Sequence, residues 1–351
     1  MSPKQEPTAV RVSAPKGRWT EYTQLSRQIK QAGLLDRRRG WYVVRIGLNL
    51  LLLAGGWAAF AILGESWWQL VVAAYLAIVF TQLAFVGHDA GHRQIFRSRR
   101  ANDLVGLLHA NLLVGISFDW WVGKHNRHHS NPNHEDLDPD ISITALAFTA
   151  DQASSKHGLV RLIARYQGWL FFPLLLLEAA HLHLASAKAI VQGRGRTSAV
   201  EGLLLLIHVA VYLGALLVVL SPLQAVLFLA VQQGLFGLCL GCAFAPNHKG
   251  MPTLTEADEL DFLRRQVLTS RNVAGSRLVD FVLGGLNYQI EHHLFPNMPR
   301  PNLRRAQPLI RAFCRDHDLP YTEASLFGSY AEAVRHLHTV GAPLRPAPAA
   351  D

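Results

Sequence analysis

Three histidine clusters recur along the chain with closely similar spacing. They read HDAGH at 88–92, HNRHH at 125–129 and QIEHH at 289–293. Residues three or four apart lie on one face of a helix, so each cluster would point several side chains toward one place. Adjacent histidines on a helix diverge by about 100°, so each HH pair can serve two different centres. Because imidazole is a common ligand of transition metals, the pattern indicates a site for more than one metal ion.

The residue types limit which metal sites are possible but do not select one metal. None of the clusters contains a cysteine, which disfavours an iron–sulfur cluster or a structural zinc site, while imidazole suits iron, copper and zinc alike. The chain has three cysteines, too few for a disulfide framework. Cys239 and Cys242 stand in an apolar run, where we expect small buried side chains. Four isolated histidines are read as interfacial or internally hydrogen-bonded: His109, His181, His183 and His208.

Long apolar stretches place these clusters beside a membrane. Half of the 351 residues are hydrophobic and only 17% are charged. Each crossing of a bilayer core needs about 20 apolar residues. Four stretches have about this length, and short turns join them in pairs: 43–63 with 67–86, and 199–220 with 223–245. The sequence therefore predicts an all-α integral membrane protein with four transmembrane helices in two hairpins.

Two further apolar stretches, 104–117 and 168–190, are predicted not to cross. The first is too short, and the second contains Pro173 and Glu178, a carboxylate that is costly near a bilayer centre. If the three clusters form one site, an even number of crossings must separate them. Both stretches are therefore expected to be interfacial or re-entrant helices.

The positive charge follows the same topology. Lys and Arg number 34 against 25 Asp and Glu, yet neither occurs in 46–92 or 197–248. Basic residues that gather between apolar segments follow the positive-inside rule rather than a nucleic-acid surface. We therefore expect a multi-pass protein of the cytoplasmic membrane, with both termini and the metal site on the cytoplasmic side. The polar, basic first 40 residues lack the pattern of a cleavable signal.

The expected organisation has six segments. These are a cytoplasmic N-terminal segment (1–42), transmembrane hairpin 1 (43–86), a cytoplasmic cap with the first two clusters and the two interfacial helices (87–198), transmembrane hairpin 2 (199–245), a cytoplasmic cap with His248 and the third cluster (246–340), and a disordered tail (341–351).

The three clusters and the four crossings together resemble the membrane fatty acid desaturase family over about residues 40–300. The flanking segments HHSNPNHEDLDPDI (128–141) and NYQIEHHLFPNMP (287–299) are particularly similar to bacterial, actinobacterial-type acyl desaturases. A glutamine at the head of the third cluster resembles front-end and related desaturases. The resemblance implies an oxidoreductase of fatty acid metabolism that uses O₂, reduced to water, to introduce a cis double bond into a long-chain acyl substrate at a di-iron centre.

The resemblance also implies a ligand set, with no catalytic side chain beyond it. The iron ligands would be His88, His92, His125, His128, His129, His248, His292 and His293. By analogy, one iron takes His88, His129, His248 and His292, and the other takes the remaining four with Gln289 nearby. Gln289 and Asn247 are possible supporting residues around these ligands. Stearoyl-type enzymes hold a water with an Asn one turn before the equivalent of His248, where this chain has Phe244.

Four residues between 117 and 129 would line the substrate entrance. Trp120 and Trp121 offer apolar walls, although plain interfacial anchoring explains them equally well. Lys124 or Arg127 could pair with an anionic head group of an acyl-CoA or acyl-lipid.

The sequence has neither an HPGG haem-domain motif nor a dinucleotide fingerprint. We therefore expect a separate electron donor, a ferredoxin with a flavin reductase. Five arginines could dock it or could simply anchor the chain at the membrane: Arg97, Arg99, Arg100, Arg304 and Arg305.

Two other functions fit parts of the pattern. A di-iron hydroxylase or ketolase shares these clusters, and only its product distinguishes it. A metal transporter or a haem-binding membrane protein would place its ligands deep within crossings, where only His208 lies.

Overall fold

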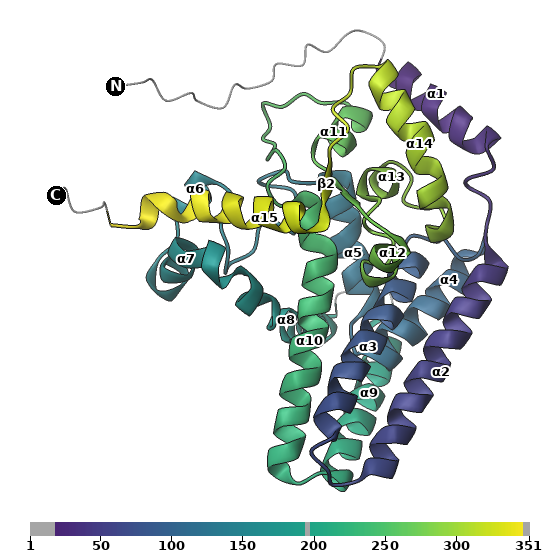
Figure 1. Cartoon of the computed structure of the whole chain (residues 1–351), viewed down its shortest axis with the longest axis vertical. Coiled ribbons are helices and arrows are strands. Elements are labelled where there is room, and N and C mark those ends of the chain that lie inside the picture. The colour runs from purple at the N-terminus through teal and green to yellow at the C-terminus, as the bar shows by residue number, and fades with distance from the viewer. Residues whose placement is uncertain (1–17, 194–196, 347–351) are drawn as a thin grey trace.

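The structure is a computed structural model that describes residues 18–193 and 197–346. It is mostly helical (Figure 1). The helices are α1 (Arg18–Gln31), α2 (Arg39–Leu63), α3 (Gln69–Gly91), α4 (Arg99–Gly106), the π-helix η1 (Leu107–Val114), α5 (Phe118–Ser130), α6 (Ala150–Ser154), α7 (Gly158–Leu175), α8 (Glu178–Val191), α9 (Ser198–Val219), α10 (Pro222–His248), α11 (Phe262–Leu268), α12 (Arg277–Val282), α13 (Gln289–Leu294), α14 (Arg300–Asp316), α15 (Leu326–Gly341) and the 3₁₀-helix η2 (Ala342–Leu344). Strands β1 (Asn272–Ala274) and β2 (Glu323–Ser325) pair in parallel, with Asn272 opposite Glu323.

Four helices, α2, α3, α9 and α10, are long and apolar enough to cross a membrane. They run side by side in the lower half of Figure 1, and their bounds agree with the four predicted crossings. In the most apolar stretch of α3, 67% of the residues are buried, against 17% in α2 and in α9. Thus α3 forms the centre of the bundle, while α2 and α9 turn apolar side chains outward, as helices in lipid do.

Two bent helix pairs correspond to the apolar stretches that we expected not to cross. The helix through α4 and η1 meets α5 at 111°, and α7 meets α8 at 81°. Each pair is compatible with a broken crossing or with a re-entrant loop. The described part of the chain therefore has four helices that could cross a membrane, or up to six if each bent pair is one span. The predicted interfacial placement of 104–117 and 168–190 therefore stays a prediction.

The structure contradicts the predicted start of the disordered tail at residue 341. Within the expected disordered tail, Gly341 is the last residue of α15, and Ala342–Leu344 form η2. Leu344 is buried in a cluster with Ala147, Ala153 and Ala164, and this apolar contact keeps the segment folded. The remaining tail residues, 347–351, lie outside the described residues, as do residues 1–17 of the predicted N-terminal segment.

A second layer lies above the bundle and has a hydrophobic core of its own. Helices α1, α11, α13 and α14 gather there (Figure 1). Their buried side chains pack together: Leu25, Ile29, Leu263, Val267, Ile290, Leu294, Leu303, Ala306 and Ile310. Since α13 carries the third histidine cluster, this core fixes the helix that presents it.

Two buried polar contacts, an ion pair and a hydrogen-bonded carboxylate, join the long helices to neighbouring segments. Arg300, at the start of α14, contacts the Asp89 carboxylate at 2.6 Å and donates to the Phe85 carbonyl at 2.6 Å. Asp89 lies between His88 and His92, so this ion pair ties the first cluster to the upper layer. A buried ion pair of this kind fixes an arrangement more than it adds stability.

The second contact is the Glu201 carboxylate on α9, which is fully buried. Its two oxygens accept hydrogen bonds from the Ser117 hydroxyl and the Asp119 N–H, both at 2.9 Å. Ser117 is the N-cap of α5, so a carboxylate on a membrane helix caps the helix that carries the second cluster.

We predict that Glu201→Leu destabilises the protein by about 1–3 kcal/mol, because two buried donors lose their acceptor. Glu201→Gln, which keeps one acceptor oxygen, should lose less. Thermal unfolding of the protein in detergent measures both effects. The exposed Glu256→Leu is the control and should change the melting temperature little. A Glu201→Leu variant as stable as this control would contradict the proposed capping.

Candidate metal centre

The structure brings all eight predicted ligand histidines into one buried group. None of them is more than 9% exposed. They come from the C-terminal end of α3 (His88, and His92 just beyond it), from α5 (His125, His128, His129), from the last residue of α10 (His248) and from α13 (His292, His293). Ring centroids of neighbours are close, 4.2 Å for His129 and His293 and 4.7 Å for His128 and His248. This proximity is what a polynuclear site requires, while ligation itself stays a prediction.

The donor nitrogens form two groups. In the first, His88, His92, His125 and His292 offer ring nitrogens within 4.8 Å of one another, and in the second, His128, His248 and His293 do so. His129 lies between the groups, since its Nε2 is 3.1 Å from His125 Nε2 and its ring stacks on His293. This grouping differs from the division implied by the resemblance, which put His248 with His88 and His292.

Hydrogen bonds explain why the second group forms. His248 Nδ1 is 2.9 Å from the Thr269 carbonyl oxygen, and His293 Nδ1 is 2.8 Å from Gln266 Oε1. His128 Nδ1 is 2.9 Å from the Asp138 carboxylate. An oxygen of this kind only accepts, so each Nδ1 carries the proton and leaves a lone pair on Nε2. Metal-binding histidines are typically oriented by such contacts.

Several other ring nitrogens are buried without a hydrogen-bond partner among the described residues. They are Nε2 of His88, His92 and His293, Nδ1 of His129, and both nitrogens of His292. Buried polar atoms are rarely left unpaired, because each costs free energy. Lone pairs that converge from several helices are satisfied by metal ions, so the residues present fit a metal centre.

Burial also keeps these imidazoles in the form that binds metal. Desolvation, followed by the influence of neighbouring imidazoles, holds the pKa of His125, His129, His292 and His293 well below its usual value. His128 differs: burial lowers its pKa, but the Asp138 and Asp140 carboxylates outweigh burial and the net shift is upward. Most of the group is therefore neutral at pH 7, as metal ligation requires.

Gln289 belongs to the second group of donors. Its side chain is buried, and its Nε2 donates a hydrogen bond to the lone pair of His248 Nε2 at 2.8 Å. Its Oε1 accepts a hydrogen bond from Asn247 Nδ2 at 3.3 Å, and Asn247 also donates to the Ala243 carbonyl. Gln289 therefore touches a predicted ligand directly, with Asn247 behind it.

The predicted entrance residues have different surroundings. Trp121 stacks on His125 with ring centroids 4.4 Å apart and also approaches His88 at 5.5 Å, so it lies against the site. Trp120 packs against the apolar core of the bundle. Lys124 forms an ion pair with Asp140, and Arg127 is exposed. A role for either cation in binding a head group stays a prediction.

Residues 261–274 support the site, although no motif in the sequence pointed to them. Gln266 is fully buried, and besides orienting His293 it donates through Nε2 to the His129 carbonyl at 2.9 Å. Thr269 orients His248, and the fully buried Arg271 donates to the Pro246 carbonyl. An isolated Gln or Thr carries no spacing signal, so only the structure identifies these contacts.

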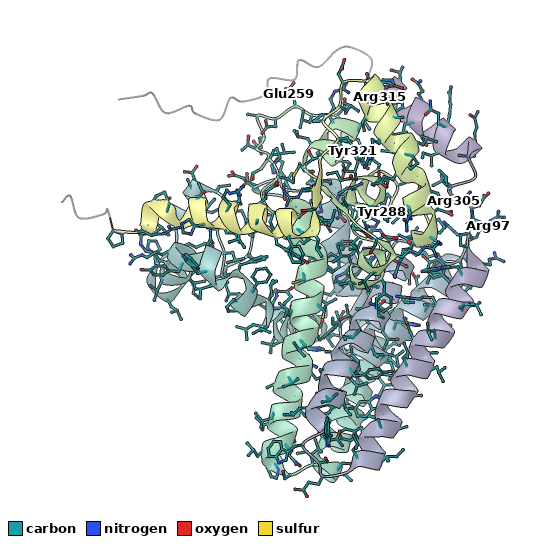
Figure 2. All side chains as sticks on the ribbon, in the orientation of Figure 1. Arg97, Glu259, Tyr288, Arg305, Arg315 and Tyr321 are labelled. Carbon is teal, nitrogen blue, oxygen red and sulfur yellow. The ribbon has the colours of Figure 1, made fainter. Side chains whose placement is uncertain are left out.

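A buried carboxylate fixes α13 between the third cluster and β1. Glu291 accepts hydrogen bonds from Asn272 Nδ2 and from the Tyr321 hydroxyl, both at 2.7 Å. Asn272 also accepts the Ile290 N–H at 2.9 Å. Burial raises the pKa of Glu291. Figure 2 shows Tyr321 in the upper layer, above the bundle. These bonds set the rotation of the helix that presents His292 and His293.

Comparison with known proteins identifies the family. The model of fatty acid desaturases matches residues 65–325, most of the chain. The chain belongs to the fatty acid desaturase family. This confirms the resemblance seen in the histidine clusters, and with it the expectation of an oxidoreductase of lipid metabolism.

Similar proteins include desaturases of several kinds. An acyl-lipid (9-3)-desaturase of Physcomitrium patens is 30% identical over 311 residues, which cover 86% of this chain and 58% of that protein. A Delta(8)-fatty-acid desaturase of Helianthus annuus is 28% identical and covers 93% of this chain and 75% of its own length. A Delta(6)-fatty-acid desaturase of Caenorhabditis elegans is 28% identical, with 93% and 76% covered. The chain thus spans little over half of the Physcomitrium patens protein and about three quarters of the other two.

We predict that Gln266→Leu weakens metal binding by about 10–100-fold, because His293 loses the acceptor that orients it. The measurement is a titration of the metal-free protein with Fe²⁺. Gln167→Leu is a matched control: Gln167 is equally buried but bonds to Ala147 and Leu337, away from the site. This control should lower the melting temperature and leave metal affinity unchanged. Equal affinities in both variants would contradict the role of Gln266.

Gln289 should differ from the histidines beside it. Gln289→Ala should leave measurable bound iron and product, because an amide is a weak iron ligand, whereas His292→Ala and His293→Ala should abolish activity. Gln289→His should retain metal and alter turnover or the position of the double bond. Iron per chain and unsaturated product are measured for all four variants. If Gln289→Ala loses both as completely as His292→Ala, the glutamine is itself a primary ligand.

Proposed function

We propose that the protein is an O₂-dependent fatty acyl desaturase that introduces a cis double bond into a long-chain acyl substrate at a di-iron centre. The observation that carries this proposal is the buried group of eight histidines at the end of the apolar helices, in a chain of the desaturase family. C–H bonds of unactivated methylenes resist acid–base chemistry, so a metal centre is required.

The eight histidines would hold two iron ions. One would take His88, His92, His125 and His292, and the other His128, His248 and His293, with Gln289 beside the second and His129 between them. When bound, the iron would supply the oxidising chemistry with O₂. The chain itself keeps most of the imidazoles neutral, through burial, and orients His128, His248 and His293 through the partners of Nδ1.

The substrate is proposed to be a long-chain acyl-CoA or acyl-lipid. Relatives are named as acyl-lipid and fatty-acid desaturases, which supports an acyl chain as the reacting group. Apolar side chains of the bundle lie below the histidines, and Trp121 offers an aromatic wall next to His88 and His125. A fixed acyl chain next to the metal ions would supply the positioning that catalysis needs.

Electrons are proposed to come from a separate carrier, a ferredoxin reduced by a flavin reductase. Of the five arginines considered for docking, Arg99 pairs with Asp103 at 3.5 Å and Arg304 with Asp280 at 3.2 Å. Arg97, Arg100 and Arg305 are exposed and form no ion pair among the described residues. These three are the better candidates for contact with an acidic ferredoxin.

The membrane is proposed to be the cytoplasmic membrane, with both termini, the metal site and the segments 87–198 and 246–340 on the cytoplasmic side. The supporting observation is the distribution of Lys and Arg, which are absent from α3, α9 and α10 and from α2 after Arg45.

The test is expression in a desaturase-deficient host, followed by fatty-acid profiling. We expect the wild type to form an unsaturated acyl product and to contain about two irons per chain. His92→Ala and His125→Ala should form no product, because each removes a proposed ligand. The exposed His157→Ala is the control and should retain activity. An active protein with one tightly bound zinc and no iron would refute the di-iron centre, and a hydroxylated product would identify a hydroxylase.

A further inference from the structure

A cationic cavity lies at the start of α2, away from the histidines. Its volume is about 640 Å³, within the range of ligand sites, and Asp36, Arg37, Arg39, Gly40 and Arg97 line it. Figure 2 shows Arg97 at the edge of the molecule, where α2 meets the upper layer. Since α2 is one of the four helices long enough to cross a membrane, the cavity lies at the level where lipid head groups are expected.

The positive charge of this cavity is largely uncompensated. None of its three arginines forms an ion pair among the described residues, and Asp36 is the one carboxylate in the lining. Arg37 donates to the Asn297 carbonyl at 2.8 Å, but its Nε is buried without a described partner. Burial and the nearby charge of Arg97 lower the pKa of Arg37. Guanidinium groups that line one cavity favour an anion between them.

An apolar stripe on α2 begins at the cavity. Gly40, Val44, Leu48 and Leu51 follow at spacings of four, four and three, which places them on one face of the helix. Val44 is 70% exposed and Leu51 69%, and Leu48 is also exposed. This face therefore points to lipid, directly below the charged cavity. Trp41, exposed beside Gly40, is typical of the interface.

We propose that this cavity binds the phosphate of an anionic membrane phospholipid, with the acyl tails along the stripe of Val44, Leu48 and Leu51. Phosphate oxygens accept the bidentate hydrogen bonds that guanidinium groups offer. The Asp36 carboxylate can accept a hydrogen bond from a head-group hydroxyl. Neither a free phosphate ion nor an acidic protein would use the apolar stripe, so the continuity of charge and stripe favours a lipid.

The test measures binding of palmitoyl-oleoyl phosphatidylglycerol to the purified full chain by native mass spectrometry. The variant is Arg37→Gln, Arg39→Gln and Arg97→Gln combined. We expect its affinity for the lipid to be lower than wild type by about tenfold or more, because each basic residue near the head group contributes to the attraction. Inorganic phosphate at the same concentration should not displace the lipid from the wild type.

A matched control removes three arginines elsewhere: Arg27, Arg315 and Arg335, all exposed. This control should bind the lipid like the wild type. The proposal is overturned if the cavity variant keeps wild-type affinity, if the control loses as much, or if inorganic phosphate competes equally. Wild-type lipid affinity with weaker ferredoxin binding in the cavity variant would instead identify a protein-docking surface. The site uses no histidine of the metal centre, so its failure would leave the proposed function intact.

Discussion

The structure depends on the cost of burying eight imidazoles together. A charged imidazole in this group would repel its neighbours, and a neutral one leaves a lone pair that no water reaches. The chain meets the first condition by burial, which lowers the pKa of most of them. It meets the second in part through acceptors for Nδ1, which direct Nε2 lone pairs toward one another. Metal ions would bind the lone pairs that hydrogen bonds leave unpaired.

Two layers of the fold, the helix bundle and the upper layer, hold the imidazoles in place. The long helices deliver His88 and His248 at their ends, and the upper layer holds α13 in its own hydrophobic core. Buried polar contacts fix the parts relative to one another: Asp89 with Arg300, and Glu201 with the N-terminus of α5. Hydrogen bonds and ion pairs are directional, whereas apolar packing is not. These contacts therefore set the rotation of the helices that present the histidines.

The features that repeat along the chain could be predicted, and the single contacts could not. Apolar length identified the four long helices, and spacing identified the histidines, because both signals accumulate over several residues. Gln266 and Thr269 act through one or two hydrogen bonds to residues far away in the sequence, so no local pattern marks them. The division of the ligands between the two irons has no local signal either, since it depends on how ring nitrogens from separate segments meet in space, and it stays a prediction. The tail was predicted too early because one buried leucine, Leu344, extends the fold.

The separation between Gln266 and His129, 137 residues, has a consequence for synthesis. At about 5–20 residues per second, the ribosome needs about 7–27 s after the second cluster before it adds the glutamine that holds that cluster to His293. During this interval, the five histidines of the first two clusters lack the third cluster, and the His129 carbonyl lacks the hydrogen bond that Gln266 donates to it. A competing divalent ion that bound during this interval would find an incomplete set of ligands. The correct metal ions are therefore expected to bind at the end of translation, once the last helices have packed onto the histidines.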